Sequence, residues 1–306
     1  MSQPTIPVCY RHPSRETYLR CSRCDRPICP SCMNDAAVGH HCPDCVAEGR
    51  RSQRSARTAF GGTQAGRHGH VTIALIALNV AVAAMVLVIG GTQSAAAGGW
   101  GGLLGGLTPA HLWGGLQPGP QIWTEIVGDR LLRGTGGVAE GEYYRLLTSM
   151  FLHYGVFHLA LNMFALWVVG GVLEPLLGRL RFLALYLVSG IGGGVATYLF
   201  ASMGTVAAGA SGAVFGLFAA FFIIMRRLGR DTSMITMILV VNLILTFVIP
   251  QISIWGHLGG LVTGGLVALG LAYAPRQHRN PIQLATIVGI VVVLTALTIT
   301  RTLLLT

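Results

Sequence analysis

The stretch Gly209-Ala210-Ser211-Gly212-Ala213-Val214-Phe215-Gly216 lies within a long apolar run of the chain. A serine flanked by residues this small can occupy a tight backbone turn at the start of a helix. Its hydroxyl then lies beside the unpaired N–H groups of the first helical turn. This arrangement is typical of a nucleophile next to an oxyanion site. The stretch therefore predicts a reactive serine in an apolar setting.

The overall composition is that of a membrane protein. Of the 306 residues, 52% are hydrophobic and 10% are charged, and the mean hydropathy is +0.62, whereas a soluble domain carries about 25% charged residues. We expect an all-α polytopic membrane protein with a bundle of seven helices. The apolar runs that predict membrane spans are 71–91, 150–173, 181–202, 207–226, 233–250, 255–273 and 282–300.

The N-terminus has a different character, because all seven cysteines precede residue 46. With one histidine they form four pairs of identical spacing, namely Cys9-x2-His12, Cys21-x2-Cys24, Cys29-x2-Cys32 and Cys42-x2-Cys45. This spacing lets both side chains of a pair bind one metal ion, so the eight ligands predict two structural zinc sites. Free thiolates need a reducing compartment, which favours the cytosol for this segment. A disulfide framework is the alternative.

The four pairs resemble the pattern of B-box-type, cross-braced zinc modules. The resemblance implies that the first and third pairs share one zinc ion and that the second and fourth pairs share the other. His40 and His41 remain alternatives to a cysteine of the last pair. The module could recruit a protein partner, or it could serve only to fold the N-terminal tail.

An arginine-rich linker is expected at 46–70. Next to a membrane span, each arginine attracts anionic lipid head groups with roughly 1 kcal/mol. A solvated tether that only sets the topology is the alternative. The arginines concerned are Arg50, Arg51, Arg54, Arg57 and Arg67.

The distribution of arginine predicts the orientation in the membrane, because cytoplasmic loops are enriched in this residue. With the N-terminus inside, the short outer loops at 203–206 and 251–254 carry no arginine. We expect a multi-pass protein of the cell membrane with a cytoplasmic N-terminus and an outer C-terminus. The long loop at 92–149 is expected to lie partly at the membrane interface, because tryptophan prefers that depth. Its tryptophans are Trp100, Trp113 and Trp123.

Five polar residues on three predicted spans fall at one depth, in the outer third of the membrane. Chance would scatter such residues in depth, so we interpret them as one site. His158 and Asn162 are one helical turn apart and share a helix face. The five residues are His153, His158, Asn162, Ser211 and His257.

Glycines explain how the helices that carry Ser211 and His257 could meet. Gly212 and Gly216 are four residues apart, as are Gly256, Gly260 and Gly264. Small residues at this spacing let two helix backbones approach closely. Taken alone, the pattern indicates ordinary helix packing. Next to a serine and a histidine, it indicates a device that positions them.

The residue types suggest the roles of the side chains. Ser211 is the expected nucleophile, and His257 is the base that takes its proton and later protonates the leaving amine. The N–H of Ser211 and the side chains of His158 and Asn162 would bind the developing oxyanion. No carboxylate is placed to orient His257, which favours a catalytic dyad over a triad.

Other intramembrane chemistries lack their residues. The chain has no His-Glu-x-x-His motif of a zinc protease, and Glu174 is the single acidic residue associated with a predicted span. This argues against an aspartyl protease and a proton-coupled transporter. We expect Glu174 to satisfy backbone groups at a helix end, Asn242 to hydrogen-bond between helices, and His153 to contact a loop.

In order and spacing, the motifs resemble the rhomboid family of intramembrane serine proteases over about residues 71–275. The resemblance implies that Ser211 and His257 act as a dyad, with His158 and Asn162 as oxyanion donors. It also implies substrates that are membrane proteins, cut in or near a transmembrane segment with helix-breaking residues. The motifs are Tyr144-Arg145-Leu146-Leu147-Thr148, His153, His158-x3-Asn162, Glu174, Gly209-Ala210-Ser211-Gly212 and Gly256-His257-Leu258-Gly259-Gly260.

Two positions depart from the pattern of many rhomboids. Tyr144 stands where many have tryptophan, which affects the packing of the loop. Phe215 stands where many have a tyrosine that stacks on the histidine, so the ring is kept and the hydroxyl is lost. Neither change removes a group that takes part in the chemistry.

The prediction is a rhomboid-type serine endopeptidase. It comprises a double-zinc module at 1–45, a linker at 46–70, a six-helix protease core at 71–275 and an extra transmembrane helix at 276–306. The expected partners are transmembrane protein substrates, the lipid bilayer and a protein bound by the zinc module, with no nucleic acid. Zinc is the expected cofactor and takes no part in catalysis. The competing interpretation is a non-catalytic rhomboid-like binder or chaperone of membrane proteins.

Overall fold

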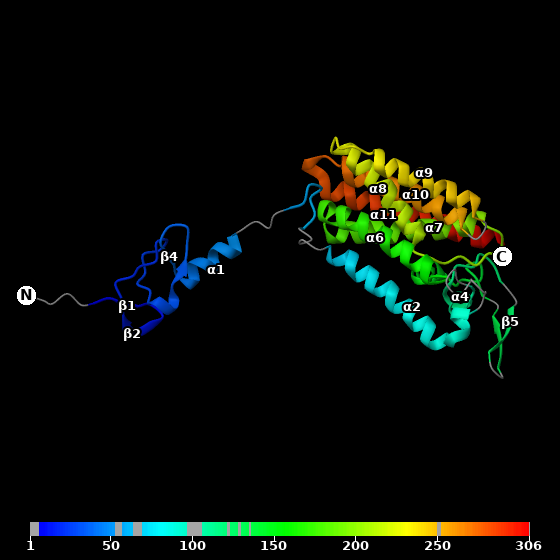
Figure 1. The fold of residues 1–306 in the computed structure, drawn as a ribbon. Coiled ribbons are helices and arrows are strands. Elements are labelled where there is room, and N and C mark those ends of the chain that lie inside the picture. The colour runs from blue at the N-terminus through cyan, green and yellow to red at the C-terminus, as the bar shows by residue number, and fades with distance from the viewer. Residues whose placement is uncertain are drawn as a thin grey trace, which may run out of the picture. The chain divides into compact units, whose positions relative to one another are not determined.

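The computed structural model describes residues 6–52, 57–63, 69–96, 106–120, 123–127, 130–134, 136–249 and 252–305. The chain forms two compact units, Met1–Ala56 and Arg57–Thr306. Figure 1 shows the strands and the helix of the first unit in blue, and the helices of the second unit from cyan to red.

The first unit is small and has little apolar core. Its buried core cluster consists of six cysteines and Ile28. So few apolar side chains are insufficient to stabilise a domain of this size. The elements are the antiparallel pair β1 (Val8–Cys9) and β2 (His12–Glu16), the 3-10 turn η1 (Pro30–Cys32), the antiparallel pair β3 (Asn34–Asp35) and β4 (His40–His41), and α1 (Pro43–Ser52).

The second unit is a helical bundle. In the described part of the chain it has seven helices of 16 residues or more: α2 (His70–Ala96), α6 (Val156–Leu177), α7 (Arg179–Phe200), α8 (Ser211–Arg227), α9 (Ser233–Val248), α10 (Ile254–Tyr273) and α11 (Arg279–Leu305). Five of these, α2, α6, α7, α10 and α11, are long and apolar enough to cross a membrane, and α9 is apolar but shorter. The predicted multi-pass bundle of seven helices is confirmed.

Two helices of the bundle begin later than the sequence predicts. The span predicted at 150–173 begins at Val156, after the short turns α5 (Arg145–Thr148) and η2 (Ser149–Phe151). The span predicted at 207–226 begins at Ser211, because Gly209 has a φ of +136° that no helix allows. His153 therefore lies on the connection before α6, and Ser211 is the first residue of α8.

Glycines hold α8 and α10 together at backbone distance. A Cβ added to Gly264 would lie 2.6 Å from the carbonyl oxygen of Gly216. A Cβ added to Gly260 would lie 2.6 Å from the carbonyl carbon of Gly212. Side chains do not pack this closely to a backbone, so the predicted glycine seam is a true contact between the two helices.

Helix α7 also takes part in this seam, which the spacing of its glycines does not predict. A Cβ on Gly193 would lie 2.5 Å from the carbonyl oxygen of Gly256 on α10. On the same helix, a Cβ on Gly192 would collide with the side chain of Thr263. The signal was present in the run Gly190-Ile191-Gly192-Gly193-Gly194, whose spacing differs from that of the other two helices.

The segment predicted as a long loop at 92–149 contains secondary structure of its own. It includes α4 (Pro109–Gly114) and the hairpin of β5 (Trp123–Val127) with β6 (Arg130–Gly134). Gly128-Asp129 between two apolar runs is a sequence signal for such a hairpin. Trp113 on α4 is 56% exposed, and Trp100 lies outside the described residues.

Parts of the predicted linker are ordered. Residues 46–52 continue α1, and residues 57–63 belong to the second unit. Phe60 is buried in the core of the bundle, and its N–H donates to the carbonyl of Leu176 at 3.4 Å. Burial of this apolar ring explains why the segment docks. Arg54 and Arg67 lie outside the described residues.

Candidate active site

Ser211 is the first residue of α8 and is half-buried. The first i−4 hydrogen bond of the helix runs from the N–H of Val214 to the carbonyl of Ala210, at 3.0 Å. The N–H groups before Val214, including that of Ser211, have no such partner, as at any helix start. These groups make the surroundings of the serine hydroxyl favourable for negative charge.

His257 lies in the first turn of α10 and is 7% exposed. Its ring stacks on the ring of Phe215, with 4.1 Å between centroids and 19° between planes. Phe215 follows Ser211 by one helical turn on the same face, and helical side chains lean toward the N-terminus of their helix. The stacking therefore places the imidazole at the Ser211 end of α8.

Backbone contact between α8 and α10 occurs next to both residues. A Cβ on Gly212, which follows Ser211, would lie 3.1 Å from the carbonyl oxygen of Gly256. Gly256 in turn directly precedes His257. The glycines of the two predicted motifs thus touch each other, next in sequence to the serine on one helix and to the histidine on the other.

His158 on α6 lies against the turn before Ser211. A Cβ on Gly209 would lie 2.9 Å from Nε2 of His158 and 3.6 Å from Oγ of Ser211. Nδ1 of His158 accepts the N–H of Tyr154 at 3.4 Å. A neutral imidazole carries one N–H, so the proton of His158 lies on Nε2. A hydrogen-bond donor therefore lies next to Gly209, two residues before the serine.

Asn162 and His153 support this arrangement from two sides. Asn162 is 6% exposed, and its Nδ2 donates to the carbonyl of His158 at 2.8 Å, which uses one of its two amide hydrogens. Nε2 of His153 accepts the N–H of Ala210 at 3.4 Å. His153 thus contacts the loop directly before Ser211, as its predicted loop role requires.

Sequence reasoning missed His111 and Tyr154. The ring of His111 on α4 stacks on Tyr154, with 4.7 Å between centroids, and Tyr154 stacks on His158 at 5.9 Å. Burial lowers the pKa of His111 to about 4, so its imidazole is neutral at physiological pH. The stack connects the segment around α4 to a predicted oxyanion donor. Tyr154 is adjacent to His153 in sequence, whereas His111 carried no signal of its own.

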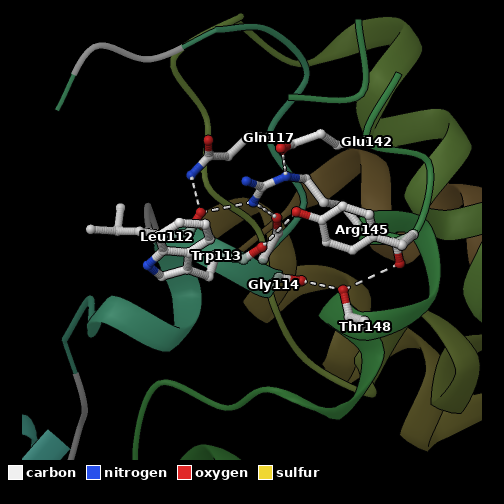
Figure 2. Close-up of polar contacts among 9 residues, drawn as sticks. Leu112, Trp113, Gly114, Gln117, Glu142, Arg145 and Thr148 are labelled. Carbon is white, nitrogen blue, oxygen red and sulfur yellow. Dashed lines mark hydrogen bonds and ion pairs between the residues drawn. The ribbon is translucent and has the colours of Figure 1, made fainter. Parts of the chain in front are cut away.

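Arg145 fastens α4 in place (Figure 2). It is 3% exposed, and its Nη1 donates to the carbonyls of Leu112 at 2.8 Å and Gly115 at 2.9 Å. Its Nε forms an ion pair with Glu142. Since these carbonyls lie at the end of α4, the guanidinium holds the helix that carries His111.

Tyr144, one of the two departures from the rhomboid pattern, also binds this helix. Its hydroxyl donates to the carbonyl of Trp113 at 3.3 Å, and Thr148 donates to the carbonyl of Gly114 at 2.6 Å. Figure 2 shows the contact of Thr148 with Gly114 beside Arg145. A tyrosine at this position thus keeps the loop attached.

Glu174 is fully buried and caps the start of α2. Its carboxylate accepts the N–H groups of Val71 at 2.9 Å and Thr72 at 2.8 Å, and also the hydroxyl of Thr72. It satisfies backbone groups at a helix end, as expected, but the helix is α2 and not its own. Asn242 was expected to bond between helices, whereas its Nδ2 donates to Ile238 within α9 at 2.8 Å.

The eight predicted metal ligands fall into two groups whose donor atoms lie within 4.8 Å of one another. The first group unites the first and third pairs, and the second group unites the second and fourth. His40 belongs to neither and lies 3.3 Å from Asp35, measured from Nδ1 to Oδ1. The groups are Cys9, His12, Cys29 and Cys32, and Cys21, Cys24, Cys42 and Cys45.

The spacing of the donor atoms fits a tetrahedral metal. Nδ1 of His12 is 3.4 Å from Sγ of Cys29 and 3.3 Å from Sγ of Cys32, and the sulfurs of Cys24 and Cys42 are 3.7 Å apart. In a tetrahedral zinc site the sulfurs are about 3.8 Å apart, since each Zn–S bond is near 2.3 Å. All seven cysteines are free thiols. Each group can therefore hold a metal ion.

Part of the chain, including this site, is similar in sequence to known proteins. The family model for the rhomboid domain matches residues 140–274. Rhomboid protease GluP of Bacillus subtilis (strain 168) is 40% identical over 147 residues, which are 45% of this chain and 28% of that protein. Putative rhomboid protease YdcA of the same organism is 39% identical over 148 residues, 47% of this chain and 74% of that protein.

RHOMBOID-like protein 5 of Arabidopsis thaliana is 37% identical over 153 residues, 47% of this chain and 49% of that protein. The chain thus spans about three quarters of YdcA, half of RHOMBOID-like protein 5 and little more than a quarter of GluP. The segment matched by the family model contains Ser211 and His257 and begins after the cysteine-rich unit.

Proposed function

Because this chain belongs to the rhomboid family, we propose that it is a serine endopeptidase that cuts transmembrane proteins within the bilayer. Ser211 is the nucleophile and His257 is the general base. His158, Asn162 and the N–H of Ser211 bind the oxyanion. Family membership supports a protease, and the assignment of roles to residues belongs to the proposal.

The observation that carries the proposal is the stacking of His257 on Phe215, one helical turn from Ser211. It brings an imidazole of α10 to the start of α8, where the hydroxyl and the unpaired N–H groups lie. The Nε2–H of His158 lies next to Gly209, two residues before Ser211. The side chains to which we assign the roles of nucleophile, base and oxyanion donor thus come from three neighbouring helices.

The proposed reaction has two halves. Oγ of Ser211 attacks the carbonyl carbon of the scissile peptide while Nε2 of His257 takes the hydroxyl proton. The oxyanion accepts hydrogen bonds from Ser211 N–H and His158 Nε2–H, the C–N bond breaks, and His257 protonates the leaving nitrogen. Water then attacks the acyl ester and gives a proton to His257. This proton returns to Oγ as the ester bond breaks.

The proposed orientation places the N-terminal unit in the cytoplasm and opens the active site toward the outer side of the cell membrane. It rests on the arginine distribution and on the free thiols of the first unit. We further propose that zinc is the metal of both cysteine groups. Thiolate and imidazole ligands in a filled tetrahedral set suit a structural zinc ion, which takes no part in proteolysis.

A cleavage assay with the purified full-length protein tests the proposal. The substrate is a single-span model protein with helix-breaking residues in its span, in detergent or in liposomes. We expect wild type to cut it, and Ser211→Ala and His257→Ala each to lose at least about 1,000-fold in kcat. Ser202→Ala, which changes an exposed serine after α7, serves as the matched control and should cut normally.

Equal cutting by wild type and both variants would refute the dyad. No cutting by wild type, together with capture of the uncut substrate, would favour the non-catalytic binder. His158→Ala should retain Ser211 and His257 in place and reduce kcat by about 10²–10³, the usual effect of losing one oxyanion donor.

A further inference from the structure

We infer that Thr246 on α9 positions His257 by fixing which of its ring nitrogens carries the proton. The inference rests on the proposed function, since it concerns the base of the same site. It supplies the orienting group for His257 that the sequence did not reveal.

Thr246 is one of two fully buried residues on α9, with 1% of its surface exposed. Its Oγ1 lies 2.7 Å from Nδ1 of His257 and 2.7 Å from the backbone carbonyl oxygen of Asn242. Both distances are those of good hydrogen bonds. The hydroxyl therefore lies between one ring nitrogen and one carbonyl oxygen.

The carbonyl decides the direction of both bonds. A carbonyl oxygen only accepts, so the single proton of the Thr246 hydroxyl must point to Asn242. Oγ1 then has only lone pairs left for His257, and Nδ1 must be the donor. The opposite arrangement would leave two oxygens 2.7 Å apart without a proton between them. The chain of bonds thus runs from Nδ1–H of His257 through Thr246 to Asn242.

This direction prepares His257 for its proposed role. A neutral imidazole with its proton on Nδ1 has a free lone pair on Nε2, which is the atom that takes the serine proton. Phe215 holds the plane of the ring by stacking, but stacking alone does not distinguish the two flipped orientations. The bond to Thr246 selects one of them. The hydroxyl of Thr246 thus takes the orienting role that a carboxylate has in a catalytic triad.

A second threonine on the same helix makes the same bond to an i−4 carbonyl without being buried against His257. Thr236 donates to the carbonyl of Thr232 at 2.8 Å, yet it is exposed. The two threonines make the same local bond, and they differ in that Thr246 is buried against His257. Thr236 is therefore a matched control.

The test measures kcat and KM for the model substrate with Thr246→Val, Thr246→Ser and Thr236→Val. Valine keeps the shape and removes the hydroxyl, whereas serine keeps the hydroxyl. We expect Thr246→Val to reduce kcat by about 10–100-fold with little change in KM, less than the about 10⁴-fold cost of a wrong tautomer in a triad protease. Thr246→Ser should restore most of kcat, and Thr236→Val should behave as wild type.

Melting temperatures of all variants accompany the kinetics, and Thr246→Ala joins the set if the valine variant does not fold. Serine and alanine then differ only in the hydroxyl. A wild-type kcat for valine or alanine would overturn the inference, as would a change confined to KM or an equal loss in Thr236→Val. If wild type itself does not cut, or Ser211→Ala cuts equally, the proposed function fails instead.

Discussion

The two units of this chain are each stabilised in a different way. The core of the first unit is made of six cysteines and Ile28, so we expect its stability to depend on the proposed metal ions. The second unit has a core of apolar side chains, and the contact between α8 and α10 within it depends on glycines that leave no side chain between the two backbones. The first unit is thus expected to need a bound metal, whereas the second needs close backbone contact between two of its helices.

The largest expected effect is the loss of metal from the first unit. Chelation of the full-length protein should unfold residues 6–52, because the remaining apolar core is insufficient. Hydrogen exchange read along the whole chain should show loss of protection in that unit and none in the bundle. Metal analysis before chelation should give two zinc ions per chain.

Two outcomes of the hydrogen-exchange measurement would contradict this difference between the units. Persistent protection of residues 6–52 after complete metal removal would show that the cysteine core is sufficient. Loss of protection in α8 or α10 would show that the bundle also depends on the metal. Cysteine oxidation is controlled by adding a reductant and then restoring zinc, which should restore protection.

The second expected effect concerns the glycine seam. Gly264→Ala places a Cβ 2.6 Å from the carbonyl oxygen of Gly216, where only a shift of a helix can relieve the contact. We expect a loss of about 1–3 kcal/mol in stability. A shift of 1 Å at the proposed dyad would also lower kcat about 100-fold. Thermal melting and the cleavage assay measure the two effects.

Gly289→Ala is the matched control for the seam. Gly289 lies on α11, and a Cβ there would meet no atom within 4 Å. The same change should therefore leave melting and cleavage at wild-type values. Equal behaviour of the two variants would mean that the backbone contact at Gly264 contributes nothing.

The comparison also shows what sequence could and could not predict. Regular spacing predicted both the metal ligands and the seam of α8 with α10, because each rests on a local repeat. The part played by α7 was not predicted, because the spacing of its glycine run differs from that of α8 and α10 and Gly193 meets Gly256 only through tertiary packing. The role of Thr246 could not be predicted either, because it also depends on tertiary packing. A single threonine in an apolar helix forms no sequence pattern, so the role of Thr246 follows only from its contact with His257 in the folded chain.

A smaller effect is expected from Glu174, a buried side chain that caps a helix of the bundle. Glu174→Gln keeps the shape of the α2 cap but removes the charge that accepts the N–H groups of Val71 and Thr72. Hydrogen bonds to charged groups contribute about 1.5–3 kcal/mol, and since glutamine can still accept one bond, we expect a loss near the lower end. Thermal melting measures it. Glu140→Gln changes an exposed glutamate and should be neutral.

The smallest expected effect concerns the two histidines nearest the second metal group. Nδ1 of His40 lies 3.3 Å from Oδ1 of Asp35, and neither His40 nor His41 is among the eight grouped donors. His40→Ala and His41→Ala should therefore keep two zinc ions per chain, whereas Cys45→Ser should lose one.

A loss of zinc in either histidine variant would mean that the second group is completed differently from the arrangement with Cys42 and Cys45. The core of the first unit would then include an imidazole from β4, and its cysteines would no longer account for its stability. The difference between the two units in what stabilises them would then be smaller. Unchanged zinc content in both variants would leave the buried thiolates as the ligands on which the second site depends.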